Sequence, residues 1–340
     1  MAYITISKKA LFYNLNTLCQ KLGSKERLSI VLKDNAYGHG LNEVATLANE
    51  FGIKRAIVRS YEEADQISNL FENIIILVPR FPHKPKENYS LVVNDIKTLK
   101  ELPKNSKIEL KFDTGMHRNG LSAKEAEEAF IFLKQHDLHL SGVMTHFRSA
   151  DVLSSELFWQ DYQWQKLKLK ILHLCKKYKL PKPLFHSANS ATVLRLNNYN
   201  DDFARCGIAI YGYHEIDTIY PVPDLKPVLN LFAEKISTRK IDKNQRIGYG
   251  GTYKAKKPLT ISTYDIGYGD GFFRFNGDGE FYLNTHQVLG KISMDSLCLK
   301  GEDSEVCILN NAKEIAKYFD TISYDVLVKL SPHIRRVIVD

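Results

Sequence analysis

One lysine stands where a covalent reaction with a carbonyl compound could begin. Residues 28–32 are a short apolar run, which predicts a strand buried on both faces, and Lys33 follows it directly. Burial favours the neutral form of a lysine, and a neutral amine attacks carbonyl groups to form a Schiff base. Lys33 is therefore a candidate Schiff-base residue. The alternative is an ordinary lysine whose ammonium group reaches solvent from the end of the strand.

The apolar runs that surround Lys33 predict a (β/α)8 barrel. Short runs suited to buried strands alternate with helical patterns over about 210 residues, which is typical of this fold. We expect its eight strands at residues 28–32, 56–58, 74–78, 91–93, 108–112, 140–144, 184–185 and 203–206.

Polar side chains gather where these strands end, and in such barrels the chemistry takes place at the carboxyl ends of the strands. The loops after the last two strands carry Ser190 and Gly207, and a hydroxyl, backbone N–H groups and a glycine suit a phosphate dianion. A nucleophilic lysine, a phosphate site and a cationic Arg205 together suggest pyridoxal phosphate as the cofactor. The residues at strand ends are Lys33, Lys111, His146, Asn189, Ser190 and Arg205.

Composition excludes several other classes of protein. With 44% hydrophobic and 25% charged residues, the chain has the composition of a globular protein. The net charge of +8 lies partly in a lysine-rich helical stretch at 166–182, which we interpret as a solvated outer face, without nucleic-acid or membrane partners. The five cysteines show no metal or redox spacing, and no secretory segment opens the chain, so we expect a cytoplasmic protein that holds no metal.

The chain changes character after residue 220. Pro221, Pro223 and Pro227 mark a linker, and short runs rich in β-formers follow it. We expect a barrel over residues 8–220 and a smaller, mainly β domain over 221–340, which residues 1–7 join.

Seven stretches, in order, carry a resemblance to a known family. They are VLKDNAYGHG, LKFDTGMHRNGL, THFRSAD, HSANSAT, ARCGIAIYGY, IGYGDGFFR and GKISMDSL. With them, and with Ser323-Tyr324-Asp325 near the end, the chain resembles the bacterial alanine racemases over nearly its whole length. The resemblance implies a homodimeric, pyridoxal-phosphate-dependent isomerase that interconverts L- and D-alanine for peptidoglycan synthesis, with an active site shared between subunits.

The resemblance also implies a role for each site residue. Lys33 would attach the cofactor and act as one base, and Tyr268, from the second subunit, would be the opposing base. Lys111 would be carbamylated and paired with Arg118. The implied cofactor-binding residues are Lys33, Tyr37, His146, Asn189, Ser190, Arg205, Gly207, Ile208 and Tyr324, and the implied substrate-binding residues are Arg118, Met294 and Asp295.

Elementary chemistry agrees with two of these roles. Racemisation needs a base on each face of a planar carbanion, and lysine and tyrosine are suitable types. An arginine facing the pyridine nitrogen does not protonate it, because the pKa of a guanidinium exceeds about 12. The ring is then a weaker electron sink, which favours return of the proton to the α-carbon.

Three positions depart from the family pattern, and two alternative functions stay open. Asp34 replaces a small residue, His117 stands where glycine is usual, and Cys206 replaces a proline or phenylalanine. The bulk of His117 puts the modification of Lys111 in question. The alternatives are a racemase of broad specificity that acts on serine or lysine, and a barrel that binds the cofactor without catalysis.

Overall fold

The computed structural model describes residues 1–80, 82, 85–196 and 199–340. Its contacts divide the chain into two compact units, each discontinuous in sequence. The first unit contains Met1–Leu11, Asn35–Glu43 and Pro227–Asp340, and the second contains Phe12–Asp34 and Val44–Lys226. The sequence-based boundary at residue 220 stays a prediction.

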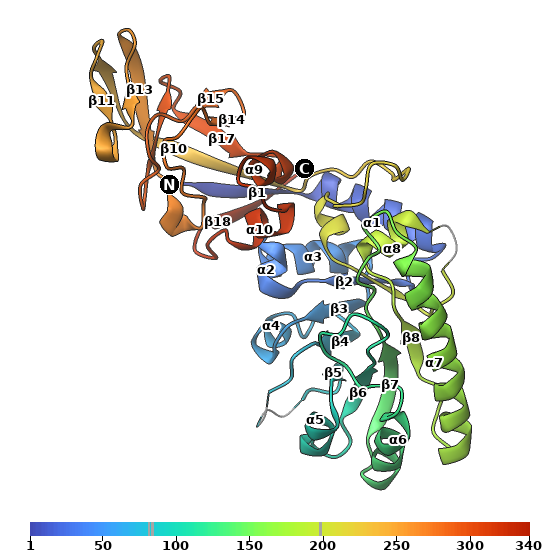
Figure 1. Ribbon diagram of the computed structural model, residues 1–340. Coiled ribbons are helices and arrows are strands. Elements are labelled where there is room, and N and C mark those ends of the chain that lie inside the picture. The colour runs from blue at the N-terminus through green and yellow to red at the C-terminus, as the bar shows by residue number, and fades with distance from the viewer. Residues whose placement is uncertain (81, 83–84, 197–198) are drawn as a thin grey trace. The chain divides into compact units, whose positions relative to one another are not determined.

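The second unit is the predicted barrel of parallel strands (Figure 1). Its strands pair in the order β8-β7-β6-β5-β4-β3-β2-β9. An isolated parallel bridge between Asn189 and Arg205 joins the two ends of this sheet, and the Arg205 N–H donates to the Ala188 carbonyl at 3.0 Å. The strands are β2 (Leu28–Val31), β3 (Arg55–Val58), β4 (Asn73–Ile76), β5 (Tyr89–Val93), β6 (Lys107–Lys111), β7 (His139–Met144), β8 (Leu184–His186) and β9 (Ala204–Cys206).

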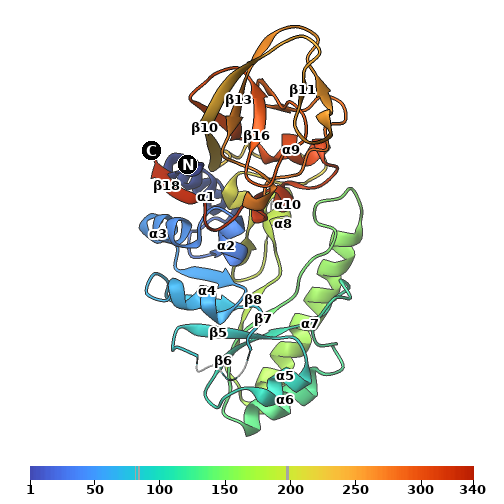
Figure 2. The same cartoon turned by 90° about the vertical axis from the view of Figure 1, so that its left-hand side faces the viewer.

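Helices of regular apolar spacing accompany these strands (Figure 2). The longest, α7 (Glu156–Tyr178), buries apolar residues three or four positions apart and packs with α6 (Ala126–Gln135) in one core that contains Trp164 and Phe130. Ser60 and Asp95 cap two short helices by accepting backbone N–H bonds. The remaining helices of this part of the chain are α1 (Lys8–Leu22), α2 (Lys33–Tyr37), α3 (Leu41–Phe51), α4 (Tyr61–Gln66), α5 (Ile96–Glu101), α8 (Ser190–Arg195) and the 3-10 turn η1 (Ile208–Tyr211).

The short helix α2, which the sequence did not predict, has a left-handed backbone. Its residues from Asp34 to Tyr37 have φ between 51° and 55°, and Gly38 follows with φ 79°. Left-handed helical geometry costs about 1–2 kcal/mol for each residue with a side chain. Asp34 and Asn35 belong to the residue types that best tolerate it. The departure at Asp34 therefore fits the backbone at that position.

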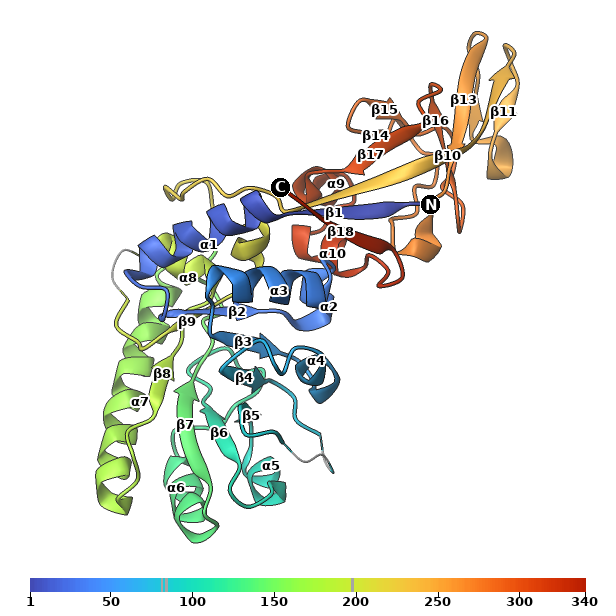
Figure 3. The ribbon, with the colours of Figure 1, turned by 180° about the vertical axis from the view of Figure 1, so that it is seen from behind.

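The first unit is built around a six-stranded sheet (Figure 3). Strand β1 (Tyr3–Ser7) pairs antiparallel with β10 (Leu229–Ile241) and parallel with β18 (Arg335–Val339). Its other strands are β13 (Leu259–Tyr264), β16 (Leu297–Lys300) and β17 (Glu305–Leu309), and two small ribbons pair β11 (Arg246–Ile247) with β12 (Tyr253–Lys254) and β14 (Tyr282–Leu283) with β15 (His286–Gln287). The unit also contains α9 (Ala312–Tyr318), α10 (Ser323–Val328), η2 (Tyr249–Gly251) and η3 (Tyr268–Asp270).

The close approach of Gly38 to α10 gives a prediction. A Cβ at Gly38 would lie 2.0 Å from the Leu327 carbonyl oxygen, whereas Gly279, in the same unit with φ 77°, has nothing within 4 Å of a built Cβ. Gly279→Ala should therefore cost only backbone strain, about 1 kcal/mol. Gly38→Ala should cost about 2 kcal/mol more, because the steric overlap adds to the strain. Urea denaturation midpoints measure both, and equal losses would contradict the assigned close contact.

Candidate active site

The barrel unit carries the larger group of predicted site residues, at or just beyond the carboxyl ends of its strands. Lys33 follows β2, and its side chain is 37% exposed. Its Nζ lies 3.5 Å from Asp34 Oδ2, and the Arg59 guanidinium lies 3.4 Å from Asp34 Oδ1. The Asp34 N–H donates to Glu63 Oε1 at 2.6 Å, so the backbone after the lysine is held at a defined place.

Positive charge surrounds the imidazole of His146, which follows β7. Burial, together with the charges of Arg205, Lys111, Arg118 and Lys33, lowers the pKa of His146 to about 3. The histidine is thus neutral at pH 7, with four cationic groups near enough to act on it. Such a field favours an anionic ligand, and both a phosphate and an amino-acid carboxylate have that character.

Lys111 is buried at the end of β6, next to an exposed loop that folds back on the strand. Burial lowers the pKa of Lys111 to about 8, with Arg118 and Arg205 acting in the same direction. Its Nζ donates to Asn119 Oδ1. The loop is fixed by bonds from the Leu121 N–H to the Lys111 carbonyl at 2.8 Å and from the Asp113 N–H to the Leu121 carbonyl at 2.9 Å.

His117, in this loop, explains one departure from the family pattern. Its φ is 55°, a conformation in which glycine is favoured and histidine is among the better tolerated side chains. Its N–H donates to Asp113 Oδ1 at 3.1 Å, and its Nδ1 lies 3.3 Å from Asp113 Oδ2. The imidazole therefore turns toward Asp113, while Arg118 stays exposed and acts on Lys111 through its charge.

Arg205 lies buried inside the barrel, where carbonyl groups hold its guanidinium. Its NH1 donates to the His186 carbonyl at 2.6 Å, and its NH2 donates to the carbonyls of Thr145 and Ser187 at 2.6 and 3.0 Å. Burial lowers the pKa of Arg205 from its ordinary value, although a guanidinium stays charged. One cation thereby ties the ends of β7, β8 and β9 together.

The loops after β8 and β9 gather hydrogen-bond donors around Ser190. Ser190 Oγ accepts the N–H of Gly207 at 2.9 Å and the N–H of Ala209 at 3.4 Å. A hydroxyl and backbone amide groups at one point suit the oxygens of a phosphate, so these residues fit the predicted cofactor. Asn189 caps α8, because its Oδ1 accepts the Thr192 N–H at 3.0 Å. The Asn189 side chain therefore fixes the backbone where the loop enters α8.

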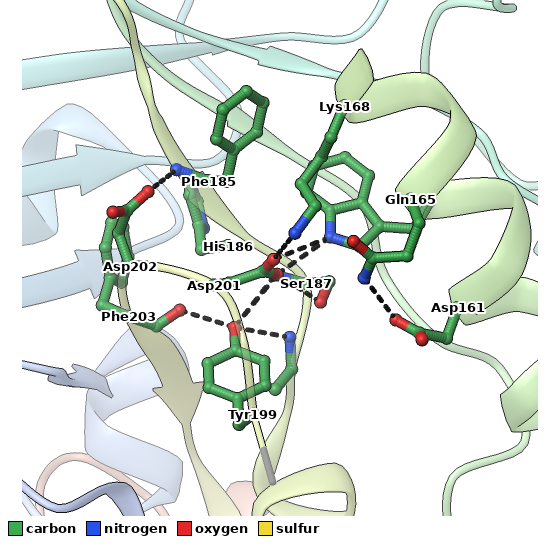
Figure 4. A network of polar contacts seen from close by, with 12 residues as sticks. Asp161, Gln165, Lys168, Phe185, His186, Ser187, Tyr199, Asp201, Asp202 and Phe203 are labelled. Carbon is green, nitrogen blue, oxygen red and sulfur yellow. Dashed lines mark hydrogen bonds and ion pairs between the residues drawn. The ribbon is translucent and has the colours of Figure 1, made fainter.

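A polar network behind this loop was missed from the sequence (Figure 4). Asp201, which is 5% exposed, accepts the Trp164 indole N–H at 2.9 Å, the Ser187 hydroxyl at 2.5 Å and the Lys168 ammonium at 2.8 Å. The Tyr199 hydroxyl accepts the N–H groups of Ser187 and Ala188 at 3.3 and 3.2 Å. The network thus anchors the segment that ends in Ser190.

Lys168 corrects one part of the sequence interpretation. The lysine-rich stretch was expected to be a solvated face, yet only 13% of the Lys168 side chain is exposed. Its position four residues after Trp164 places both side chains on one face of α7, where each donates to Asp201. That spacing, together with an acidic residue just before β9, is the signal that could have revealed the network.

The first unit brings Tyr268 and Met294 side by side. The Tyr268 N–H donates to the Ser293 carbonyl at 3.1 Å, and the Gly269 N–H donates to the Met294 carbonyl at 2.8 Å. A Cβ at Gly267 would lie 2.2 Å from that Met294 oxygen, so the turn requires a glycine there. Tyr268 is 38% exposed and Met294 is 55% exposed, and the Arg274 guanidinium lies 5.7 Å from the Tyr268 ring centroid.

The same unit holds Tyr37 beside Tyr324, with ring centroids 5.8 Å apart. The loop after Tyr37 is tied to the last part of the chain, because Arg336 donates to the carbonyls of Gly38 at 2.9 Å and Ser331 at 2.8 Å. His39 is fully buried in this loop, and its Nδ1 lies 3.0 Å from the Tyr37 carbonyl. The two tyrosines predicted for the phosphate therefore lie together in the first unit.

His39 gives a pH prediction. Burial lowers its pKa from 6.5 to about 4, so the unfolded chain binds a proton here between these values while the folded chain does not. The contribution of His39 to the free energy of unfolding is therefore fully present above about pH 6.5. It is lost as the pH falls toward 4, by about 1.4 kcal/mol per pH unit for one histidine. His39→Gln should make the acid loss of stability smaller by that slope in urea denaturation at pH 6.5, 5.5 and 4.5. Measurement at pH 8 separates any general effect of the substitution, and an unchanged acid slope would contradict the assignment.

The described residues contain neither a membrane-spanning helix nor a cluster of metal ligands. None of their helices combines the length and hydropathy needed to cross a bilayer. No group of three or more histidine, cysteine, aspartate or glutamate side chains among them is arranged to hold a metal ion.

Comparison with known proteins covers both units. Residues 6–215 match the family described as alanine racemase, N-terminal domain, and residues 228–338 match alanine racemase, C-terminal domain. An alanine racemase of a Nitratiruptor species is 49% identical over 340 residues, covering 100% of both chains.

Solved structures have the same fold. Alanine racemase from Bacillus anthracis with bound L-Ala-P matches with a TM-score of 0.87 and 27% identity, over 100% of this chain and 95% of that one. Histidine racemase from Leuconostoc mesenteroides subsp. sake matches with a TM-score of 0.85 and 24% identity, over 100% of this chain and 98% of that one. The second likeness shows the fold alone.

Proposed function

Since the chain belongs to the alanine racemase family, it is a pyridoxal-phosphate-dependent isomerase that interconverts L- and D-alanine, and we propose that Lys33 and Tyr268 carry its two proton transfers. The observation that carries the assignment of Lys33 is its place after β2, where its charge acts on a neutral His146 together with three other cations. A lysine that attaches the cofactor must lie where the anionic groups of cofactor and substrate are attracted. Lys33 meets that condition.

Within this proposal the bound cofactor draws electrons from the amino acid, which makes the proton on the α-carbon acidic. Lys33 attaches the cofactor through its amine and exchanges a proton at one face of the α-carbon. Tyr268 exchanges a proton at the opposite face through its phenol oxygen. Each needs to lie within about 3 Å of that carbon's proton in the working complex.

The other residues bind and orient. We propose that Arg205 faces the pyridine nitrogen as a hydrogen-bond donor, that His146 lies against the ring, and that Arg118 binds the carboxylate of alanine. The support is the rigid hold on Arg205 and the cationic field described above. The residues proposed to contact the phosphate or its loops are Tyr37, Asn189, Ser190, Gly207, Ile208 and Tyr324, and Met294 and Asp295 are proposed to contact the substrate.

Lys111 is proposed to carry a carbamate. Carbamylation requires a neutral amine, and burial lowers the pKa of Lys111 to about 8, so a larger share of this amine is neutral at physiological pH than of an exposed lysine. The modified group would be an anion, and Arg118 and Arg205 supply compensating positive charge. The bond to Asn119 would then have to be rearranged.

The proposed setting is the cytoplasm, where D-alanine would be supplied for peptidoglycan. The five cysteines of the chain are all free, which fits a reducing compartment. We propose that the working form is a homodimer whose subunits share each active site.

Substrate turnover tests the proposed function against both alternatives. The purified, cofactor-loaded enzyme should racemise L-alanine with a kcat/KM at least tenfold above its values for L-serine, L-lysine and L-histidine, measured by chiral chromatography. Equal values for lysine or serine would show broad specificity, and no turnover of any amino acid would show a cofactor carrier.

Borohydride reduction should add the mass of the cofactor to the peptide that contains Lys33, and modification elsewhere would contradict its role.

Subunit mixing tests the shared site. Lys33→Ala and Tyr268→Phe should each be inactive, and Tyr268→Phe should retain the cofactor because its phenyl ring keeps the local packing. After subunit exchange, a mixed dimer holds one site with both Lys33 and Tyr268. Random 1:1 mixing should then restore about a quarter of the wild-type activity, because half of the dimers are mixed and each has one working site. Absence of recovery, with exchange verified by mass spectrometry, would contradict the shared site.

A further inference from the structure

A chain of three buried polar side chains crosses the barrel beneath the proposed site. Glu109 on β6, His186 on β8 and Arg205 on β9 are 3%, 0% and 5% exposed. Glu109 Oε2 lies 2.9 Å from His186 Nε2, and His186 Nδ1 lies 2.8 Å from Arg205 NH1. No site role was predicted for Glu109 or His186 from the sequence.

The chemistry of these groups fixes the direction of each hydrogen bond. A guanidinium has only donors, so Arg205 donates and His186 Nδ1 accepts. Burial lowers the pKa of His186 well below 6.5, so the imidazole is neutral and carries one proton. That proton must then lie on Nε2, which donates to Glu109 Oε2. Glu109 Oε2 is therefore the acceptor that pairs the Nε2–H of the tautomer able to accept from Arg205, and without it that proton would be buried without a partner.

The surrounding residues keep this arrangement in place. The imidazole stacks on the Phe203 ring at 4.2 Å between centroids, and the Arg55 guanidinium lies 4.3 Å from the Phe203 centroid. A Cβ at Gly142, on the intervening strand β7, would lie 1.8 Å from Glu109 Oε2. Any side chain at that position would displace the Glu109 carboxyl group from its present place beside His186.

We propose that Glu109 is a positioning residue, which fixes the tautomer and orientation of His186 and thereby the direction in which the Arg205 guanidinium faces the cofactor ring. The effect on the cofactor ring rests on the proposed function, whereas the link from Glu109 through His186 to Arg205 does not. Glu109 acts as a hydrogen-bond acceptor rather than as a charge. Burial raises the pKa of Glu109 to about 8 against the charges of Arg55 and Arg205, which act in the opposite direction.

Three substitutions separate the acceptor from the ionisable group and the packing. Glu109→Gln keeps an acceptor oxygen within reach and removes the ionisable group. Glu109→Asp keeps the ionisable group and withdraws the acceptor by about 1.5 Å, the length of one carbon–carbon bond. Glu109→Leu keeps the volume and removes the acceptor. Asp65→Asn is the control, because Asp65 accepts the Tyr89 hydroxyl at 2.7 Å and pairs with Lys86, outside the chain of three.

Two measurements are needed, and the first of them does not depend on catalytic activity. Nitrogen-15 NMR of protein with labelled histidine, without cofactor, reports the tautomer of His186, whose signal is assigned by its loss in His186→Gln. The visible absorption of the bound cofactor and kcat/KM for alanine report the effect on the site. We expect Glu109→Gln and the control to keep the Nε2–H tautomer and a kcat/KM within about threefold of wild type. Glu109→Asp and Glu109→Leu should lose that tautomer, shift the absorption maximum and lower kcat/KM by about 10- to 100-fold, as removal of supporting hydrogen bonds does elsewhere.

Other outcomes overturn the proposal. Equal effects of Glu109→Gln and Glu109→Asp, or no effect of either, would show that Glu109 does not act as an acceptor. If Glu109→Leu does not fold, the comparison of glutamine with aspartate still decides. Should the wild-type protein fail to racemise alanine, the proposed function fails, while the NMR result still tests the link between Glu109 and His186.

Discussion

The buried guanidinium of Arg205 is the interaction on which the barrel's proposed active face depends. From its place on β9, the guanidinium donates to carbonyls at the ends of β7 and β8. The Arg205 backbone also forms the bridge to Asn189 that joins β8 with β9, the two ends of the sheet. A charge taken out of water is costly unless its donors are satisfied, so this arrangement holds only if those strand ends stay in place. His146, Ser190 and Gly207 follow β7, β8 and β9, so all three lie in the segments next to the strand ends that Arg205 joins. The residue that would face the cofactor is thus also the residue that keeps the strand ends in register.

The barrel could be predicted from the sequence because its strands are short apolar runs separated by helical spacing. Such runs report burial on both faces directly, and the structure confirms each of the eight predicted strands. Lys33, Lys111, His146, Ser190 and Arg205 could be singled out because all lie at or next to the carboxyl end of a predicted strand. Position along a strand therefore predicted that Lys33, Lys111 and Arg205 would lie near enough to His146 for their charges to act on it.

Other features depend on contacts between residues far apart in sequence. Asp201 meets Trp164 and Lys168 across more than thirty positions, so the spacing of these two residues on α7 indicates a shared face but does not alone identify the acceptor. Glu109 alternates with the apolar residues Ile108 and Leu110, a pattern that in many sheets marks the solvent-facing side, and its partner His186 is 77 residues away. The left-handed turn at Asp34 to Tyr37 was also missed, because only two of its four residues are types that favour such a backbone. Pairing across the fold, rather than composition, creates these features.

The strand pairing of the first unit affects how the chain can fold during translation. Strand β1 leaves the ribosome before its partners β10 and β18, which begin at Leu229 and Arg335, so it cannot pair until those later segments have been made. The barrel strands, each paired mainly with its neighbour in sequence, can assemble during that interval, whereas the first strand stays an unsatisfied edge. Translation arrest before the last strand would leave a nascent chain with a formed barrel and an incomplete sheet, which is the kind of species that chaperones bind.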